Sequence, residues 1–176
     1  ILNNKNIEYK IFDYVKRYNE TDYIKYLKGS KYGIILDAHE SQGFAIEEAL
    51  SCNVPLLVWN TKYMSQEYGS RYPDIPCNTV PYWSDKCGEI FYEKSDFETS
   101  FEIFVNKLEQ YEPRKYILDI LSVEKCANNF MKLINSSIFF FWWLLKYKFS
   151  GAKLLVKKVN FFIFFENFKN FSKIIM

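Results

Sequence analysis

Glu40 and Glu48 are separated by seven residues, and Gly43 lies between them, just before a segment with helical spacing. The amino end of a helix presents unpaired backbone N–H groups and the positive end of a dipole, so a pyrophosphate can bind there. A glycine lets the backbone come close to such a ligand. A carboxylate such as Glu48, about one to two turns into the helix, can accept hydrogen bonds from both hydroxyls of a ribose. Glu40, in the preceding loop, can reach a sugar on the far side of the phosphates.

Each of these residues also has a simpler interpretation. Isolated glutamates near a helix start are more often solvated acids that the helix dipole stabilises. For His39, a loop histidine bonded to backbone and a phosphate contact agree equally well with the sequence. Aromatic residues in the following loop are more often packing groups than base-stacking groups: Tyr63, Tyr68, Tyr72, Tyr82 and Trp83.

For the two glutamates, the surrounding segments favour the ligand-binding interpretation. The run Tyr32 to Leu36 is apolar and compact, which predicts a strand buried in a parallel sheet. In such sheets ligands bind outside the carboxyl ends of the strands, where the loop 37–43 lies. A helix over 44–51 then carries Phe44, Ile46, Ala49 and Leu50 as apolar positions. Asn53 is suited to a left-handed stop, and residues 54–59 predict the next buried strand.

Further elements are predicted on both sides of this unit. A strand is expected over residues 7–15, and a helix from an N-cap at Thr21 to Lys28, with Gly29 as its left-handed end. The long loop 60–88 is a candidate site wall. Three more elements follow it: a short edge strand over 89–92, an amphipathic helix over 96–110 and a helical region over 114–134. The alternation predicts an α/β fold, a partial Rossmann-like parallel sheet flanked by helices.

The stretch Glu40 to Pro55 reads ESQGFAIEEALSCNVP. It resembles the E-x7-E signature of retaining glycosyltransferases built from two Rossmann domains (GT-B fold), a group that includes glycogen and sucrose synthases and bacterial cell-surface sugar transferases. The likeness keeps both glutamates, the glycine, the Glu-Ala pair and the trailing Val-Pro, and it extends more weakly over residues 7–134. It implies the C-terminal, donor-binding half of a GT-B fold.

The resemblance implies a hexosyltransferase that passes a sugar from a nucleoside-diphosphate sugar to an acceptor hydroxyl with retention, without a cofactor or a metal. Glu40 would be catalytic at the donor sugar, and Glu48 would bind the nucleotide ribose. The alternative is a nucleotide-sugar-binding fragment without turnover. The other implied donor-binding residues are His39, Gln42, Gly43 and Phe44.

Two departures from the family pattern concern basic residues and the helix end. The family has an upstream Arg and Lys that neutralise the pyrophosphate, whereas Lys16 and Arg17 come too late in the chain to match them. Asn53 replaces the usual Gly, a mild change because Asn tolerates the left-handed conformation. We therefore expect an N-terminally truncated domain whose partners are a nucleotide-sugar donor, an unidentified acceptor and a missing N-terminal acceptor domain. No nucleic-acid partner is expected.

The cysteines and the single histidine bear on compartment and metal content. Four cysteines, unevenly spaced, favour reduced thiols and a cytoplasmic protein over a disulfide framework. His39 has no Cys or His at ligand spacing, so no structural zinc is expected.

A change in charge near Asn135 predicts two regions, 1–135 and 136–176. The second region has seven lysines and one acid, a net charge of +6, which leaves −4 for the first because the whole chain carries +2. Its apolar runs Ile138 to Leu145 and Phe161 to Phe165 are shorter than the ~18 residues that a bilayer span needs. With the lysines, they are suited to contact an anionic membrane surface. The alternative is an extension read out of frame in an AT-rich gene.

Overall fold

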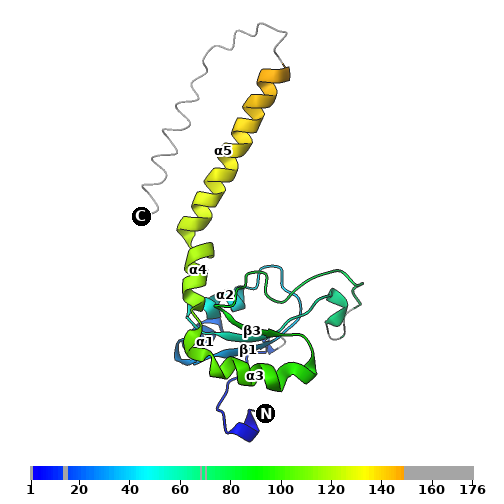
Figure 1. Cartoon of the computed structure of the whole chain (residues 1–176), viewed down its shortest axis with the longest axis vertical. Helices are drawn as coiled ribbons and strands as arrows, with labels where there is room; N and C mark the ends of the chain where they lie inside the picture. The colour runs from blue at the N-terminus through cyan, green and yellow to red at the C-terminus, as the bar shows by residue number, and fades with distance from the viewer. Residues whose placement is uncertain (1, 14–15, 68, 70, 149–176) are drawn as a thin grey trace. The chain divides into compact units, whose positions relative to one another are not determined.

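The computed structural model describes residues 2–13, 16–67, 69 and 71–148. Three parallel strands form one sheet in the order β1 (Gly33–Leu36), β2 (Leu56–Trp59) and β3 (Gly88–Phe91) (Figure 1). Helices flank this sheet, so the fold is α/β and Rossmann-like in a general sense. The chain divides into two compact units, Ile1–Cys126 and Ala127–Met176, and the sheet belongs to the first.

The central strand β2 organises two hydrophobic cores, because successive side chains of a strand point to opposite faces. Leu56 and Val58 are buried against α1 (Glu20–Gly29), α2 (Phe44–Ser51) and α4 (Pro113–Leu121). Leu57 is buried on the other face, against Phe101 and Phe104 of α3 (Phe97–Asn106). The sheet is therefore covered on both faces, as expected for parallel strands.

The predicted strands and helix around residues 32–59 are confirmed, with small shifts at their ends. Asn53 has a φ of 62°, so it is the predicted left-handed residue after α2. Its side-chain oxygen also accepts a hydrogen bond from the backbone N–H of Arg114 at 3.2 Å, which ties the end of α2 to the start of α4. The predicted strand near residues 89–92 is β3, and it pairs with β2 in parallel.

Three predictions in the N-terminal segment are wrong. Residues 7–13 form no strand, and residues 14–15 lie outside the described residues. Their aromatic character serves packing instead, because the Phe12 ring packs edge-on against Tyr23 at 5.0 Å. Helix α1 begins after Asn19, whose side chain accepts a hydrogen bond from the backbone N–H of Thr21 at 2.8 Å, so Asn19 and not Thr21 is the N-cap. Gly29 is the last helical residue and is not left-handed.

The first α-helix after β3 ends earlier than predicted, and the last helix ends later. The helix expected over 96–110 is α3, followed by a 3-10 turn, η5 (Leu108–Gln110). The region expected over 114–134 is two helices, α4 and α5 (Val123–Lys148), because Ser122 takes an extended conformation between them. In the described part of the chain, no helix is long and apolar enough to cross a membrane. The run Phe161 to Phe165 lies outside the described residues.

Candidate functional site

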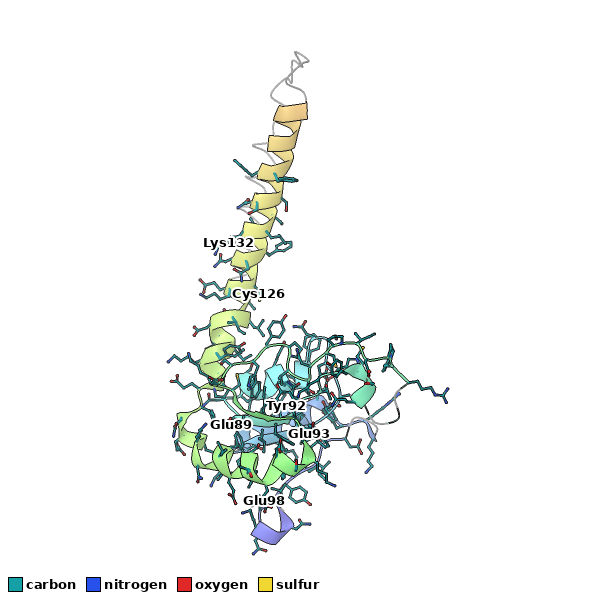
Figure 2. All side chains as sticks on the ribbon, turned by 45° about the vertical axis from the view of Figure 1, so that its right-hand side comes forward. Glu89, Tyr92, Glu93, Glu98, Cys126 and Lys132 are labelled. Atoms are coloured by element: carbon teal, nitrogen blue, oxygen red, sulfur yellow. The ribbon has the colours of Figure 1, made fainter. Side chains whose placement is uncertain are left out.

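The carboxyl ends of the three strands meet at one edge of the sheet, because the strands are parallel and in register. The loop 37–43 leaves β1 at this edge and leads into α2, as the sequence predicts. The neighbouring strand ends supply Asn60 after β2 and Tyr92 and Glu93 after β3, of which the last two are labelled in Figure 2. Ligands of open α/β sheets bind at this kind of edge.

Glu40 is held in this loop by backbone contacts. Its N–H donates to the carbonyl of Asn78 at 3.0 Å, which fastens the loop to the returning end of the long segment after β2. Burial raises the pKa of the Glu40 carboxyl, and the Asp37 carboxylate raises that pKa further. The backbone N–H of Gly43 and the His39 ring lower the pKa of Glu40, a smaller influence than burial. Glu40 is thus a half-buried carboxyl whose pKa is changed by burial and by its neighbours.

Gly43 makes the turn from the sheet edge into α2. Its φ of 76° and ψ of 44° are left-handed, a conformation that glycine adopts without strain. Its carbonyl accepts the first helical hydrogen bond, from the N–H of Glu47 at 2.9 Å. Within the described residues, the backbone N–H groups of Phe44 and Ala45 have no hydrogen-bond acceptor, and the Phe44 side chain is 72% exposed. The amino end of α2 is therefore open to a ligand.

Gln42 is bonded to a carboxylate that the sequence analysis did not single out. Its side-chain amide donates to Glu47 Oε1 at 3.1 Å, across the first turn of α2. Burial raises the pKa of Glu47, while the hydrogen bond from Gln42 lowers that pKa. In the sequence, only the position of Glu47 directly beside Glu48 pointed to this residue.

Glu48 lies on α2, one turn after Ala45, whose carbonyl is bonded to α1. The phenol of Tyr23 donates to the carbonyl of Ala45 at 2.9 Å. Burial raises the pKa of Tyr23 above its usual range, and the charges of Tyr18 and Glu48 raise this pKa further, which places Glu48 near that ring. No hydrogen bond among the described residues joins Glu48 to Glu40. The structure therefore groups His39, Glu40, Gln42 and Gly43 in one loop and places Glu48 on the adjoining helix.

His39 has no backbone partner at Nδ1. This nitrogen is buried and makes no hydrogen bond within the described part of the chain, although it lies 3.3 Å from Glu67 Oε2. The distance falls within ion-pair range. The ring also packs edge-on against Tyr72 at 5.8 Å. His39 thus connects the loop after β1 to the long segment after β2.

The long segment after β2 returns to the sheet through a buried polar contact. The N–H of Thr79 donates to Asn60 Oδ1 at 2.7 Å. Trp83 packs against the core, as the packing interpretation expects, whereas Tyr63 and Tyr72 are exposed. Tyr68 lies outside the described residues. Lys62 was not singled out by the sequence, and its ammonium group lies 4.5 Å from the centre of the Tyr92 ring.

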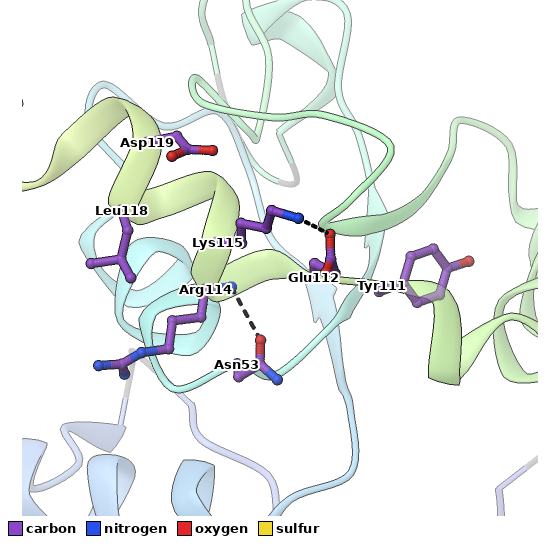
Figure 3. Close-up of a pocket in the computed structure, with 7 residues that line it drawn as sticks. All are labelled: Asn53, Tyr111, Glu112, Arg114, Lys115, Leu118 and Asp119. Carbon is purple, nitrogen blue, oxygen red and sulfur yellow. Dashed lines mark hydrogen bonds and ion pairs between the residues drawn. The ribbon is translucent and has the colours of Figure 1, made fainter.

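A shallow depression of about 460 Å³ lies away from this edge, at the amino end of β2 (Figure 3). Its two cations are already engaged. Arg114 Nη1 donates to the Ser51 carbonyl at 2.7 Å, and Lys115 pairs with Glu112 at 2.9 Å. The lining residues are Asn53, Tyr111, Glu112, Arg114, Lys115, Leu118 and Asp119. None of them is a predicted donor-binding residue.

The raised pKa of Glu40 predicts how its replacement changes stability. A carboxyl whose pKa is higher in the folded than in the unfolded state stabilises the fold when protonated, and this contribution is lost as the pH rises through the folded-state pKa. We therefore expect Glu40→Gln to raise the melting temperature at pH 7, with a smaller gain at pH 4. Thermal unfolding of both proteins at the two pH values measures this. A Gln variant that melts below the wild type at pH 7 would contradict the assignment of Glu40 as a destabilised carboxylate.

Comparisons with protein-family models, curated proteins and solved structures find no match to this chain. The family likeness therefore rests on the residues of the stretch Glu40 to Pro55 and on their place at the carboxyl edge of a parallel sheet.

Proposed function

We propose that this chain is the donor-binding, C-terminal half of a retaining GT-B glycosyltransferase, which transfers a sugar from a nucleoside-diphosphate sugar to an acceptor hydroxyl. One observation carries the proposal. Glu40 lies on a loop that joins the carboxyl end of β1 to the open amino end of α2 through a left-handed Gly43. In this arrangement a diphosphate would bind at the amino end of α2 while the attached sugar contacts Glu40.

The chemistry follows from the groups at this edge. In transfer with retention, positive charge develops on the sugar as the bond to the diphosphate breaks, and negative charge develops on the leaving group. We assign stabilisation of the leaving diphosphate to the N–H groups of Phe44 and Ala45 at the amino end of α2. The carboxylate of Glu40, with Asp37 nearby, favours positive charge on the sugar. Lys62 supplies a cation at the same edge.

Glu48 is assigned to the ribose, because a carboxylate can accept from two neighbouring hydroxyls. We expect Glu48→Gln to weaken binding of nucleoside diphosphates by about tenfold or more, since each hydrogen bond to a charged group contributes ~1.5–3 kcal/mol. Isothermal calorimetry of the intact protein with UDP, GDP and ADP measures this, and the tightest of the three identifies the base.

The matched control is Glu102→Gln on α3, which removes an exposed carboxylate from a different helix. It is expected to leave the affinity within twofold of wild type. Equal affinities for the Glu48→Gln protein and the wild type would remove Glu48 from the site. The side of α2 near Tyr23 would then be a packing surface.

A second candidate function is nucleotide-sugar binding without turnover. The observation in its favour is the acidic character of this edge, where Asp37 and Glu40 of the loop and Glu67 of the segment after β2 oppose a diphosphate. Lys62 is the lysine placed at the strand ends. Calorimetric binding together with no transfer or hydrolysis of the donor by the intact protein would favour this function over the enzyme.

A further inference from the structure

Helix α5 carries an apolar face in its residues 127–138. Successive residues of an α-helix are about 100° apart, so six apolar side chains fall within an arc of about 160° that also includes Ser137. The opposite side carries the polar residues Asn128, Asn129, Lys132, Asn135 and Ser136. We call the following set the apolar face of α5: Ala127, Phe130, Met131, Leu133, Ile134 and Ile138.

One edge of this face is exposed. Phe130 is 59% exposed and Leu133 is 64% exposed, whereas Met131, Ile134 and Ile138 along the centre of the face are half-buried. Neighbouring large apolar side chains that are exposed to water mark an interaction site. The sequence predicts a membrane contact only in the residues after 135. Helix α5 begins directly after Ser122, so the helix that could make this contact starts earlier in the chain.

We propose that the apolar face of α5 binds the surface of an anionic lipid bilayer, with α5 lying in the plane of the interface. Charge supports this occupant. Lys132 lies on the polar side of the helix, and the residues from 136 onward carry a net charge of +6. Each lysine near an anionic surface contributes about 1 kcal/mol. A helix with an aromatic and aliphatic face and lysines on its polar side has the composition of an interfacial helix.

The alternative occupant, the same face of a second copy, fits less well. A seam between two helices buries one stripe and leaves the opposite side in water. Phe139 lies on that opposite side and is 76% exposed. The sequence from Ile138 to Leu145 contains only apolar residues, and a helical run of this length measures about 12 Å, which is too short for the ~30 Å of a bilayer core. Such a run is suited to enter the interface, and no span is found in the described residues.

The test is co-sedimentation of the full chain with vesicles of phosphatidylcholine alone and of phosphatidylcholine with phosphatidylserine. The wild type is expected to bind the anionic vesicles more strongly. The double variant Phe130→Gln/Leu133→Gln is expected to lower the partition coefficient by about tenfold or more, because each large apolar side chain contributes ~1.5–3 kcal/mol when fully buried. Both residues are exposed, so the fold should tolerate the change. Circular dichroism checks that the helix content is retained.

The matched control is Asn128→Gln/Asn135→Gln, which changes two residues on the polar side and is expected to stay within twofold of wild type. Binding of the Phe130→Gln/Leu133→Gln variant within twofold of wild type would overturn the proposal, since residues outside the face would then carry the binding. Equal binding to both kinds of vesicle would overturn the anionic preference. A wild type that ignores vesicles but sediments as a dimer, which the same double variant dissociates, would identify a second copy as the occupant.

Discussion

Replacing Glu40 with glutamine is expected to lower sugar transfer by the intact protein by about a hundredfold or more. Loss of one preorganised electrostatic contact to a transition state typically costs ~10²–10³ in rate. Glutamine keeps the shape and an acceptor oxygen but removes the negative charge beside Asp37 and the Gly43 N–H. The measurement is the rate of transfer from saturating nucleoside-diphosphate sugars that carry the base identified by calorimetry, tested as a panel of sugars.

The stability measurement separates a catalytic role from a folding role. Glu40→Gln is expected to be at least as stable as the wild type at pH 7, so a loss of rate in that variant is not caused by unfolding. Glu98→Gln on α3 is the control, because Glu98 is an exposed carboxylate on a helix that packs under the sheet (labelled in Figure 2). Activity of Glu40→Gln within threefold of wild type would remove Glu40 from catalysis and leave only the binding function.

Replacing Gly88 with alanine is expected to destabilise the first unit by at least about 3 kcal/mol. Gly88 begins β3 with a φ of 138°, and a Cβ atom there would lie 1.9 Å from the carbonyl oxygen of Leu56. The obstacle is backbone of the central strand, so it cannot move aside without separating β2 from β3. The strand ends that position the loop of Glu40 would shift with them.

Urea unfolding followed by tryptophan fluorescence measures the change. Gly29→Ala is the control, because Gly29 ends α1 and an added Cβ there has no atom within 4 Å. Alanine at a helical position is expected to be neutral or to stabilise by up to about 1 kcal/mol. A loss below 1 kcal/mol for Gly88→Ala would show that β2 and β3 can separate at little cost, against the register described above.

The central α/β unit was predictable because each of its parts has a local signal. The run before Asp37 has the continuous apolar character of a buried parallel strand, α2 has helical spacing, and Asn53 tolerates a positive φ. The N-terminal strand was not predictable in this way. Residues 7–13 have strand-like composition, but Phe12 and Ile7 instead pack against opposite cores, a choice that depends on elements distant in the chain.

The same distinction between local signals and distant contacts applies to the candidate site. Spacing alone predicts that Glu40 and Gly43 lie at the edge of a strand, because the loop between β1 and α2 is short. Spacing does not reveal that the Tyr23 phenol bonds to Ala45 at the start of the helix that carries Glu48, because that contact requires α1 to pack on α2. The carbonyl of Asn78 and the cation of Lys62 reach the site from the long segment after β2, and no local pattern marks either residue.

The amino-acid sequence by itself thus determined the α/β unit and the placement of Glu40 in the loop before α2, because hydrophobic period and backbone preference are local properties. Tertiary structure alone decided which distant groups contact that loop. It brought Asn78, from the long segment after β2, to the backbone N–H of Glu40, and it left Phe130 and Leu133 of α5 exposed. These outcomes depend on how strands and helices pack across the fold, and contacts between distant residues leave no periodic signal along a single chain.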